Sequence, residues 1–216
     1  MTALADSVIL LHGLVRSDRS MQKMETVLSG RGYCVQNVSY DSTRHGIETL
    51  AVKAIEPALE ACPADRKVHF VTHSLGGILV RQYLSRHRIE NLGRVVMLGP
   101  PNKGSEVVDK LGDFPGFQFM HGEAGMQLGT GETSVPNRLG AANFDLGIIA
   151  GTRSINLILS SMIPGADDGK VSVENTRLEG MSDHLEMKVT HPFMMRNNQV
   201  IEQVIHYLEN GKFKRE

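Results

Sequence analysis

The sequence is poor in the features that mark several functional classes. It has only two cysteines, Cys34 and Cys62, among 216 residues, and their spacing fits neither a metal site nor a redox motif. A disulfide between them is one interpretation, and two buried or incidental thiols are the one we prefer. The formal net charge is only -1, so bulk electrostatics favours neither nucleic acid nor an anionic membrane as a partner.

Long apolar runs and cofactor motifs are also missing. Residues 1–7 lack the basic segment and the long apolar run of a signal peptide, and Val8–Leu11 is too short to cross a bilayer. We therefore expect a reduced, cytoplasmic location and no stable membrane insertion. The sequence has no P-loop, dinucleotide fingerprint or Cys-x-x-Cys motif, and His121 with Glu123 falls short of a metal site. We expect neither a cofactor nor a metal.

What the sequence does contain is an alternation of strand-like and helix-like segments. Short apolar runs typical of buried strands occupy Val8–Leu11, Tyr33–Val38, Val68–Thr72, Arg94–Leu98, Phe144–Ala150 and Leu185–Thr190. Helical periodicity covers Ser20–Leu28, Ile47–Leu59, the segment that follows Leu75, and Val200–Leu208. Such alternation predicts a single α/β domain over residues 1–216. We expect a three-layer α/β/α sandwich with a mostly parallel sheet of about six strands.

One long stretch, Pro100–Ala142, shows no regular pattern. It is rich in glycine and carries several large apolar side chains, namely Phe114, Phe117, Phe119, Met120 and Met126. A long loop inside a compact domain is often functional. This stretch is therefore either a small cap over a pocket or a surface excursion with its own small core. Its apolar residues are compatible with the entrance to a pocket for acyl or lipid-like substrates.

The segment Thr72–Gly77 predicts a nucleophilic serine. Its residues, Thr-His-Ser-Leu-Gly-Gly, lie between a predicted strand and a predicted helix, which is the context of a nucleophile elbow. The elbow holds the serine, here Ser74, on a strained turn with its hydroxyl exposed above the sheet, and the two glycines let strand and helix approach closely. Thr72 replaces the first glycine of the usual Gly-x-Ser-x-Gly pattern. The alternative is that Ser74 only caps the helix that begins at Leu75.

Two backbone N–H groups are candidates for stabilising an oxyanion. In a nucleophile elbow one donor is the N–H of the residue after the serine, here Leu75. The other comes from the loop after the first strand, where His12-Gly13-Leu14 stands, and the N–H of Leu14 is the candidate. Gly13 lets the backbone bend toward the substrate. His12, Gly13 and His73, the neighbour of the nucleophile, are expected to line the substrate pocket.

An acid and a base follow the serine in the chain order that this arrangement requires. Asp167 and Asp168 lie in a glycine-flanked turn beyond the fifth predicted strand, and both are candidates for the acid. A plain surface turn is the alternative for this segment. His191 follows the sixth predicted strand, where its imidazole can reach Ser74 while a carboxylate orients its other nitrogen.

These motifs together resemble the bacterial lipase and esterase branch of the α/β-hydrolases, which includes small lipases of Bacillus and the Pseudomonas lipases. The residues that carry the resemblance are Val8–Leu14, Thr72–Gly77, Pro101–Ser105, Asp168–Val171 and His191. The resemblance implies a reduced α/β-hydrolase fold with Leu14 as an oxyanion donor. It also implies Asp168 as the triad acid, because in that family an Asp precedes a similar short turn. Such relatives are commonly secreted, so the missing signal peptide favours an intracellular, esterase-like role.

The predicted function is hydrolysis of a carboxylic ester by Ser74, His191 and Asp168 through an acyl-enzyme. An acyltransferase or a thioesterase with the same triad is a close alternative. A non-catalytic homologue that binds a ligand or a protein is a second alternative, because a fold alone does not prove an activity. The expected partner is a small-molecule ester or acyl substrate. The sequence indicates neither the acyl-chain length nor the oligomeric state.

Overall fold

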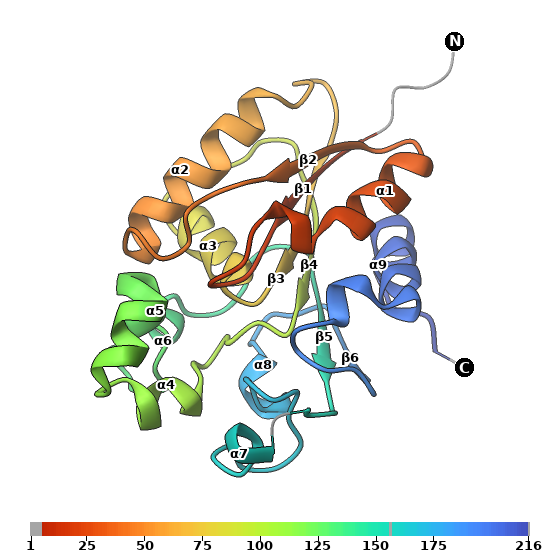
Figure 1. The fold of residues 1–216 in the computed structure, drawn as a ribbon. Helices are drawn as coiled ribbons and strands as arrows, with labels where there is room; N and C mark the ends of the chain where they lie inside the picture. The colour runs from red at the N-terminus through yellow and green to blue at the C-terminus, as the bar shows by residue number, and fades with distance from the viewer. Residues whose placement is uncertain (1–5, 156, 216) are drawn as a thin grey trace.

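The sheet at the centre of the molecule is parallel throughout. The computed structural model describes residues 6–155 and 157–215, and within them the strands form one six-stranded sheet in the order β2-β1-β3-β4-β5-β6. The strands are β1 (Ser7–Leu11), β2 (Cys34–Val38), β3 (Val68–His73), β4 (Leu92–Leu98), β5 (Leu146–Gly151) and β6 (Asp183–Met187). The predicted α/β fold is confirmed (Figure 1).

Helices cover both faces of this sheet (Figure 1). They are α1 (Gln22–Gly30) and α9 (Asn198–Asn210) on one face, and α2 (Ile47–Glu60) and α3 (Leu75–Leu84) on the other. Successive side chains of a strand point to opposite faces. Accordingly, Val8 and Leu10 of β1 join the core under α1 and α9, whereas Ile9 and Leu11 join the core under α2 and α3. Two apolar cores thus flank the sheet.

The strand order places a topological switch point at the carboxyl ends of β1 and β3. The chain runs from β1 outward to β2 and then returns past β1 to β3, so the connections on either side of β1 run in opposite directions. In open parallel sheets, ligands bind at the carboxyl ends of the strands at such a switch point. Leu11 of β1 pairs with Thr72 of β3, which brings the segments that follow the two strands together.

About half of the stretch expected to be irregular, Pro100–Ala142, is helical, and this corrects the sequence-based prediction. Its helices are α4 (Glu106–Leu111), α5 (Pro115–Met126) and α6 (Val135–Arg138). Pro115 occupies the first turn of α5, where a missing N–H costs nothing. Gly122, with φ 61, kinks the same helix and helped to hide its periodicity. These helices gather beyond the carboxyl ends of the strands (Figure 1).

The strand boundaries differ from the prediction by one to three residues, with the largest shift at β6. β5 begins at Leu146 rather than Phe144, and β6 spans Asp183–Met187 rather than Leu185–Thr190. β6 lies at the edge of the sheet and is partly exposed, so polar residues such as Glu186 interrupt its apolar pattern. The remaining short elements are α7 (Leu157–Ser160), α8 (Val173–Thr176) and the 3-10 turns η1 (Asp18–Ser20) and η2 (Met194–Arg196).

A buried arginine fixes the helical stretch after β4 to the rest of the fold. Arg81 of α3 is only 5% exposed and donates to the carbonyl oxygens of Asn102, Pro136 and Gly140 at 3.0, 2.9 and 2.9 Å. It also reaches the side-chain oxygen of Asn102 at 3.2 Å. Burial lowers the pKa of Arg81 to about 10. The four acceptors compensate for taking this charge out of water.

The thiols and the helices bear on two further expectations. Cys34 and Cys62 are both free and half-buried, so the disulfide between them is not formed. Each helix within the described ranges is too short or too polar to reach across a bilayer.

Candidate active site

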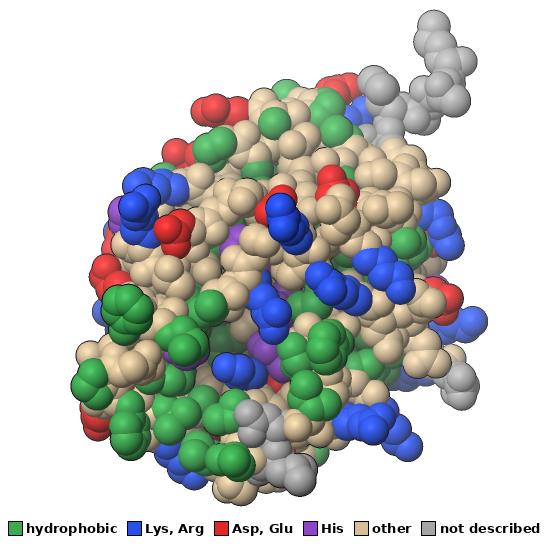
Figure 2. Space-filling model, viewed as in Figure 1, with side chains coloured by type: hydrophobic (Ala, Val, Ile, Leu, Met, Phe, Trp, Pro, Cys, Tyr) green, Lys and Arg blue, Asp and Glu red, His purple; other side chains and the backbone are tan. Residues whose placement is uncertain are grey.

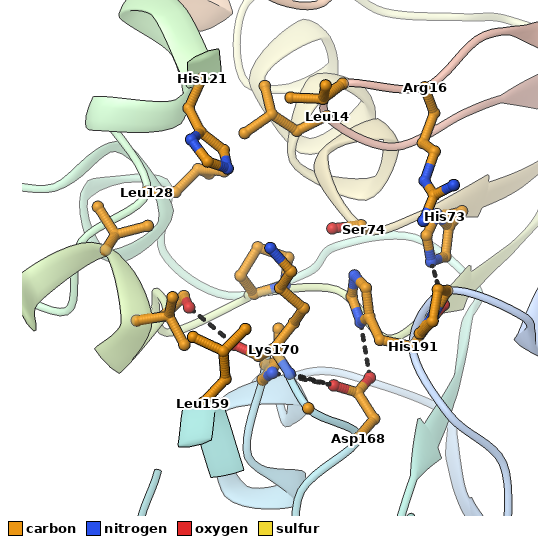
Figure 3. Close-up of a pocket in the computed structure, with 18 of the residues that line it drawn as sticks. Leu14, Arg16, His73, Ser74, His121, Leu128, Leu159, Asp168, Lys170 and His191 are labelled. Carbon is orange, nitrogen blue, oxygen red and sulfur yellow. Dashed lines mark hydrogen bonds and ion pairs between the residues drawn. The ribbon is translucent and has the colours of Figure 1, made fainter. Parts of the chain in front are cut away.

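Ser74 lies on a strained turn between β3 and α3. Its backbone has φ 52 and ψ -118, a conformation that costs energy for any residue other than glycine. The side chain makes no capping hydrogen bond to α3, which removes the support for a purely structural role as a helix cap. Its hydroxyl has no hydrogen-bond partner among the described residues and faces a cavity (Figure 3).

Two glycines let the elbow pack against the end of β1. A Cβ on Gly76 would lie 2.6 Å from the carbonyl oxygen of Leu11, and a Cβ on Gly13 would lie 2.7 Å from Nδ1 of His73. Contacts this short are not possible for a real side chain, so both positions require glycine. The loop after β1 is therefore held directly beside Ser74.

Asp168 and His191 form a buried pair in the same cavity. Oδ2 of Asp168 lies 2.7 Å from Nδ1 of His191, and the exposed fractions of the two residues are 0% and 7%. Oδ1 of Asp168 accepts hydrogen bonds from the N–H groups of Lys170 and Val171 at 3.0 and 2.9 Å. Because Nδ1 donates to the carboxylate, Nε2 is the nitrogen of His191 left to act as a base. The imidazole lies between Asp168 and Ser74 (Figure 3).

The neighbouring carboxylate, Asp167, is engaged elsewhere. Its Oδ2 accepts a hydrogen bond from the hydroxyl of Ser160 at 2.6 Å, and its Oδ1 accepts one from the N–H of Gly169 at 2.7 Å. Both bonds stabilise the turn that carries Asp168. Of the two acid candidates, the structure brings Asp168 rather than Asp167 to His191.

Of the three residues expected to line the pocket, one lies in the lining of the cavity and two do not. His73 lines the cavity, whereas His12 and Gly13 lie behind it. The ring of His12 is fully buried and stacks on Tyr40 with ring centres 4.0 Å apart, and burial lowers its pKa. Gly13 contributes close packing against His73 and not a wall of the pocket. The sequence could not reveal this, because the side of the loop that faces the cavity depends on the packing of Tyr40.

His73 supports the loop that carries His191. Its Nε2 lies 3.0 Å from the main-chain carbonyl oxygen of His191, and the two ring centres are 4.7 Å apart. A carbonyl can only accept, so Nε2 carries the proton and Nδ1 does not. Burial above all, and then the neighbouring His191, hold the pKa of His73 well below its usual value. His73 is therefore a neutral donor.

The loop after β1 presents the predicted oxyanion donors. The N–H of Leu14 has no acceptor among the described residues, and that of Leu75 opens α3, where no helical acceptor exists. The next residue, Val15, has φ 55, and its N–H donates to the hydroxyl of Ser42 at 3.0 Å. Within the described ranges, Val15 and Ser74 alone among non-glycine residues have positive φ. Backbone strain is thus concentrated on both sides of the site.

A cavity of about 460 Å³ opens beside Ser74, which is within the usual size of a small-molecule site. Most of its wall is apolar and comes from Leu14, Pro101, Val107, Val108, Phe117, Met120, Leu128, Leu159 and Val171. Three apolar residues of its lining, Val15, Met120 and Ile155, are also largely exposed. Figure 2 shows hydrophobic side chains gathered around a hollow on this face.

Two cations interrupt the apolar wall. Arg16, which follows the oxyanion loop, and Lys170, which follows Asp168, both line the cavity. Neither was predicted from the sequence as a site residue, although Lys170 lies inside the motif that identified Asp168. Burial, and after it the charge of Arg16, lowers the pKa of Lys170. Among the described residues, no group of three or more His, Cys, Asp and Glu side chains is arranged to hold a metal.

The comparisons with known proteins place this chain in a family. The family model described as palmitoyl protein thioesterase matches residues 7–143. The chain belongs to this family. The match covers the elbow at Ser74 and the oxyanion loop, and it ends before Asp168 and His191. No match was found among curated protein sequences.

Solved structures agree on the fold. The mature lipase BlEst2 of Bacillus licheniformis has a TM-score of 0.72 and 20% identity over 95% of this chain and 93% of its own. The propeptide form of the same lipase has a TM-score of 0.75. The chain described here spans only 52% of the length of that form. Phospholipase PlaB from Legionella pneumophila has a TM-score of 0.73 and 14% identity over 97% of this chain and 60% of its own. The metagenomic carboxyl esterase MGS0156 has a TM-score of 0.70 and 17% identity over 88% and 66%. These likenesses confirm the α/β-hydrolase fold.

Proposed function

We propose that this protein is a serine hydrolase that cleaves acyl esters or thioesters with Ser74, His191 and Asp168. The observation that carries the proposal is the buried Asp168–His191 pair, 2.7 Å apart, in the cavity that Ser74 faces from a strained elbow. Strain of this kind is retained where the surrounding structure needs the residue in one position. Membership of the thioesterase family supports the same class of reaction.

The chemistry follows from the arrangement of these three groups. Nε2 of His191 takes the proton as Oγ of Ser74 attacks the acyl carbon, and Asp168 stabilises the imidazolium that forms. The N–H groups of Leu14 and Leu75 stabilise the oxyanion. The leaving alcohol or thiol takes the proton from His191, and a water that His191 deprotonates then releases the acid. The missing Ser74–His191 hydrogen bond is consistent with this role, because such bonds often tighten only when substrate is bound.

The cavity favours a substrate with an apolar acyl chain. Residues of the excursion 100–142, including Val107, Phe117 and Leu128, form much of its apolar wall. The excursion therefore serves as one side of the acyl pocket in this proposal, and burial of each methylene of the chain favours binding by about 0.8 kcal/mol. The family match favours a thioester as a second substrate class beside the carboxylic ester.

The test is hydrolysis of p-nitrophenyl esters from two to sixteen carbons and of matched acyl thioesters of N-acetylcysteamine. The wild type is expected to hydrolyse medium or long chains faster than acetate, and Ser74→Ala and His191→Ala are expected to lose turnover. A fluorophosphonate probe should label the wild type and not Ser74→Ala. Turnover that appears only when an alcohol acceptor is added would point to an acyltransferase. No turnover together with no labelling would overturn the proposal in favour of a binding role.

A further inference from the structure

The two cations of the cavity have no use in the acyl transfer just described. Arg16 lies on the loop after β1, and Lys170 lies on the turn that holds Asp168, so they reach the cavity from different rims (Figure 3). The side chain of neither residue has an ion-pair partner among the residues that the structure describes. Lys170 is half-buried in a mostly apolar space. A partly buried cation normally has an anion beside it.

The cavity offers a single carboxylate to these two cations. Among the described residues, Asp168 is the one acidic residue in the lining; its charge acts on Lys170, but both of its oxygens are already hydrogen-bonded to His191 and to the N–H groups of Lys170 and Val171. The charge of Asp168 is balanced by His191 when the imidazole is protonated during the reaction. Arg16 and Lys170 then remain as two positive charges in the lining of one cavity. An anion from the substrate would relieve the repulsion between them.

The position of the cations assigns the anion to one part of the substrate. The acyl chain occupies the apolar wall made by residues such as Phe117 and Leu128. Arg16 is exposed at the rim, where the leaving group passes to solvent. A guanidinium and an ammonium together are well suited to a phosphate, which offers several acceptor oxygens.

We propose that Arg16 and Lys170 select acyl substrates whose alcohol or thiol portion carries a phosphate group. This inference rests on the proposed hydrolase function and names its substrate class. The phosphate belongs either to a lipid headgroup or to a nucleotide-containing thiol. Both sources present the same chemistry to the two cations.

Two matched pairs of substrates test the inference and separate the sources. The lipid pair is decanoyl lysophosphatidate and monodecanoylglycerol, and the thioester pair is decanoyl-coenzyme A and S-decanoyl-pantetheine, each below its aggregation concentration. In the lipid pair only the phosphate differs. Coenzyme A also carries an adenosine, so S-decanoyl-4′-phosphopantetheine is measured as well, because it differs from S-decanoyl-pantetheine by one phosphate alone. The wild type is expected to show a higher kcat/KM for the phosphorylated member of one pair, and that pair identifies the source.

The variants Arg16→Gln and Lys170→Met remove one charge each and keep most of the side-chain volume. Each is expected to reduce the phosphate preference about tenfold, mainly through KM, as loss of one charged hydrogen bond predicts. The preference is the ratio of kcat/KM for the two members of a pair, so a change that affects both members equally cancels. Arg16→Lys and Lys170→Arg should retain most of the preference. Arg19→Gln, which removes an exposed cation of η1 outside the cavity lining, is the matched control and should leave the ratio unchanged.

Failure of this inference is distinguishable from failure of the proposed function. Equal kcat/KM within both pairs, or a preference that both variants retain, would overturn the inference while hydrolysis of p-nitrophenyl octanoate keeps the proposed function intact. If the wild type turns over no substrate, calorimetry decides the inference with octyl phosphate and octanol as the probes. Tighter binding of octyl phosphate that is lost in Lys170→Met supports it, and equal binding of the two probes refutes it.

Discussion

His73, the residue before the proposed nucleophile, donates a hydrogen bond from Nε2 to the main-chain carbonyl of His191 at 3.0 Å. The bond joins the end of β3 to the loop that carries the proposed base. The position of His191 relative to Ser74 is therefore set by a main-chain contact as well as by Asp168. His73 is a positioning residue in this arrangement, because its hydrogen bond goes to the main-chain carbonyl of His191 and not to the nitrogen of His191 that would take the proton.

Replacing His73 by phenylalanine removes the donor and keeps an aromatic ring in the same space. We expect kcat for a p-nitrophenyl ester to fall about tenfold with little change in KM, because a misplaced base weakens the transition state more than substrate binding. Steady-state kinetics on the purified variant provides the measurement. A rise in KM with unchanged kcat would show that His73 acts as a pocket wall instead.

The buried state of His73 also predicts how stability depends on pH. Its pKa is depressed in the folded protein, so below the unfolded value of about 6.5 the unfolded chain binds a proton that the folded chain resists. The free energy of unfolding therefore falls as the pH decreases through this range, by at most about 1.4 kcal/mol per pH unit for one histidine. Urea unfolding at pH 7.5, 6.5 and 5.5 measures the slope, and His73→Phe should make it shallower. An equal slope in the variant would contradict the assignment.

The two adjacent carboxylates form a matched pair for testing the proposed acid. Asp168→Asn leaves a similar shape but removes the charge that orients His191, so kcat is expected to fall by about 10³- to 10⁴-fold. Asp167→Asn changes a side chain that bonds Ser160 and Gly169, so its effect should be on thermal stability with kcat within a few-fold of wild type. Similar losses of kcat in both variants would refute the distinction between them.

The buried guanidinium of Arg81 predicts a large effect far from the reacting atoms. Arg81→Met leaves the carbonyls of Asn102, Pro136 and Gly140 without their donor, and we expect a loss of about 3 kcal/mol or more in urea unfolding. Arg86→Met is the control on the same side of the fold. Arg86 is exposed and pairs only with Glu48 in the described residues, so its loss should cost less than about 1 kcal/mol.

Local patterns were enough to predict the parts of this molecule that depend on neighbouring residues. The strand–serine–helix arrangement around Ser74 lies within one short segment. The buried strands are recognisable in the sequence because their apolar runs are continuous. The helices of 100–142 were hidden because glycines such as Gly122 break their periodicity. β6 was misplaced because an edge strand does not need an unbroken apolar sequence.

The residues that sequence reasoning missed are those that only tertiary structure brings together. Arg16 and Lys170 are far apart along the chain. Lys170 lies inside the motif that identified Asp168, but the sequence does not show that both side chains enter one cavity. The reverse holds for His12, which stands in the expected motif but turns away from the cavity to stack on Tyr40. Motifs identify which loops reach the site, and packing decides which side chains of those loops face it.

The strand order has a consequence for how the protein would lose activity. Ser74 follows β3, which has a hydrogen-bonded strand on each side, whereas His191 follows β6, the half-exposed strand at the edge. Edge elements with few buried contacts open at a lower free energy than central ones. Fraying of β6 would separate the proposed base from the proposed nucleophile while the middle of the sheet stays intact. On heating or in denaturant, the hydrolysis proposed for this site should therefore be lost before the secondary structure is.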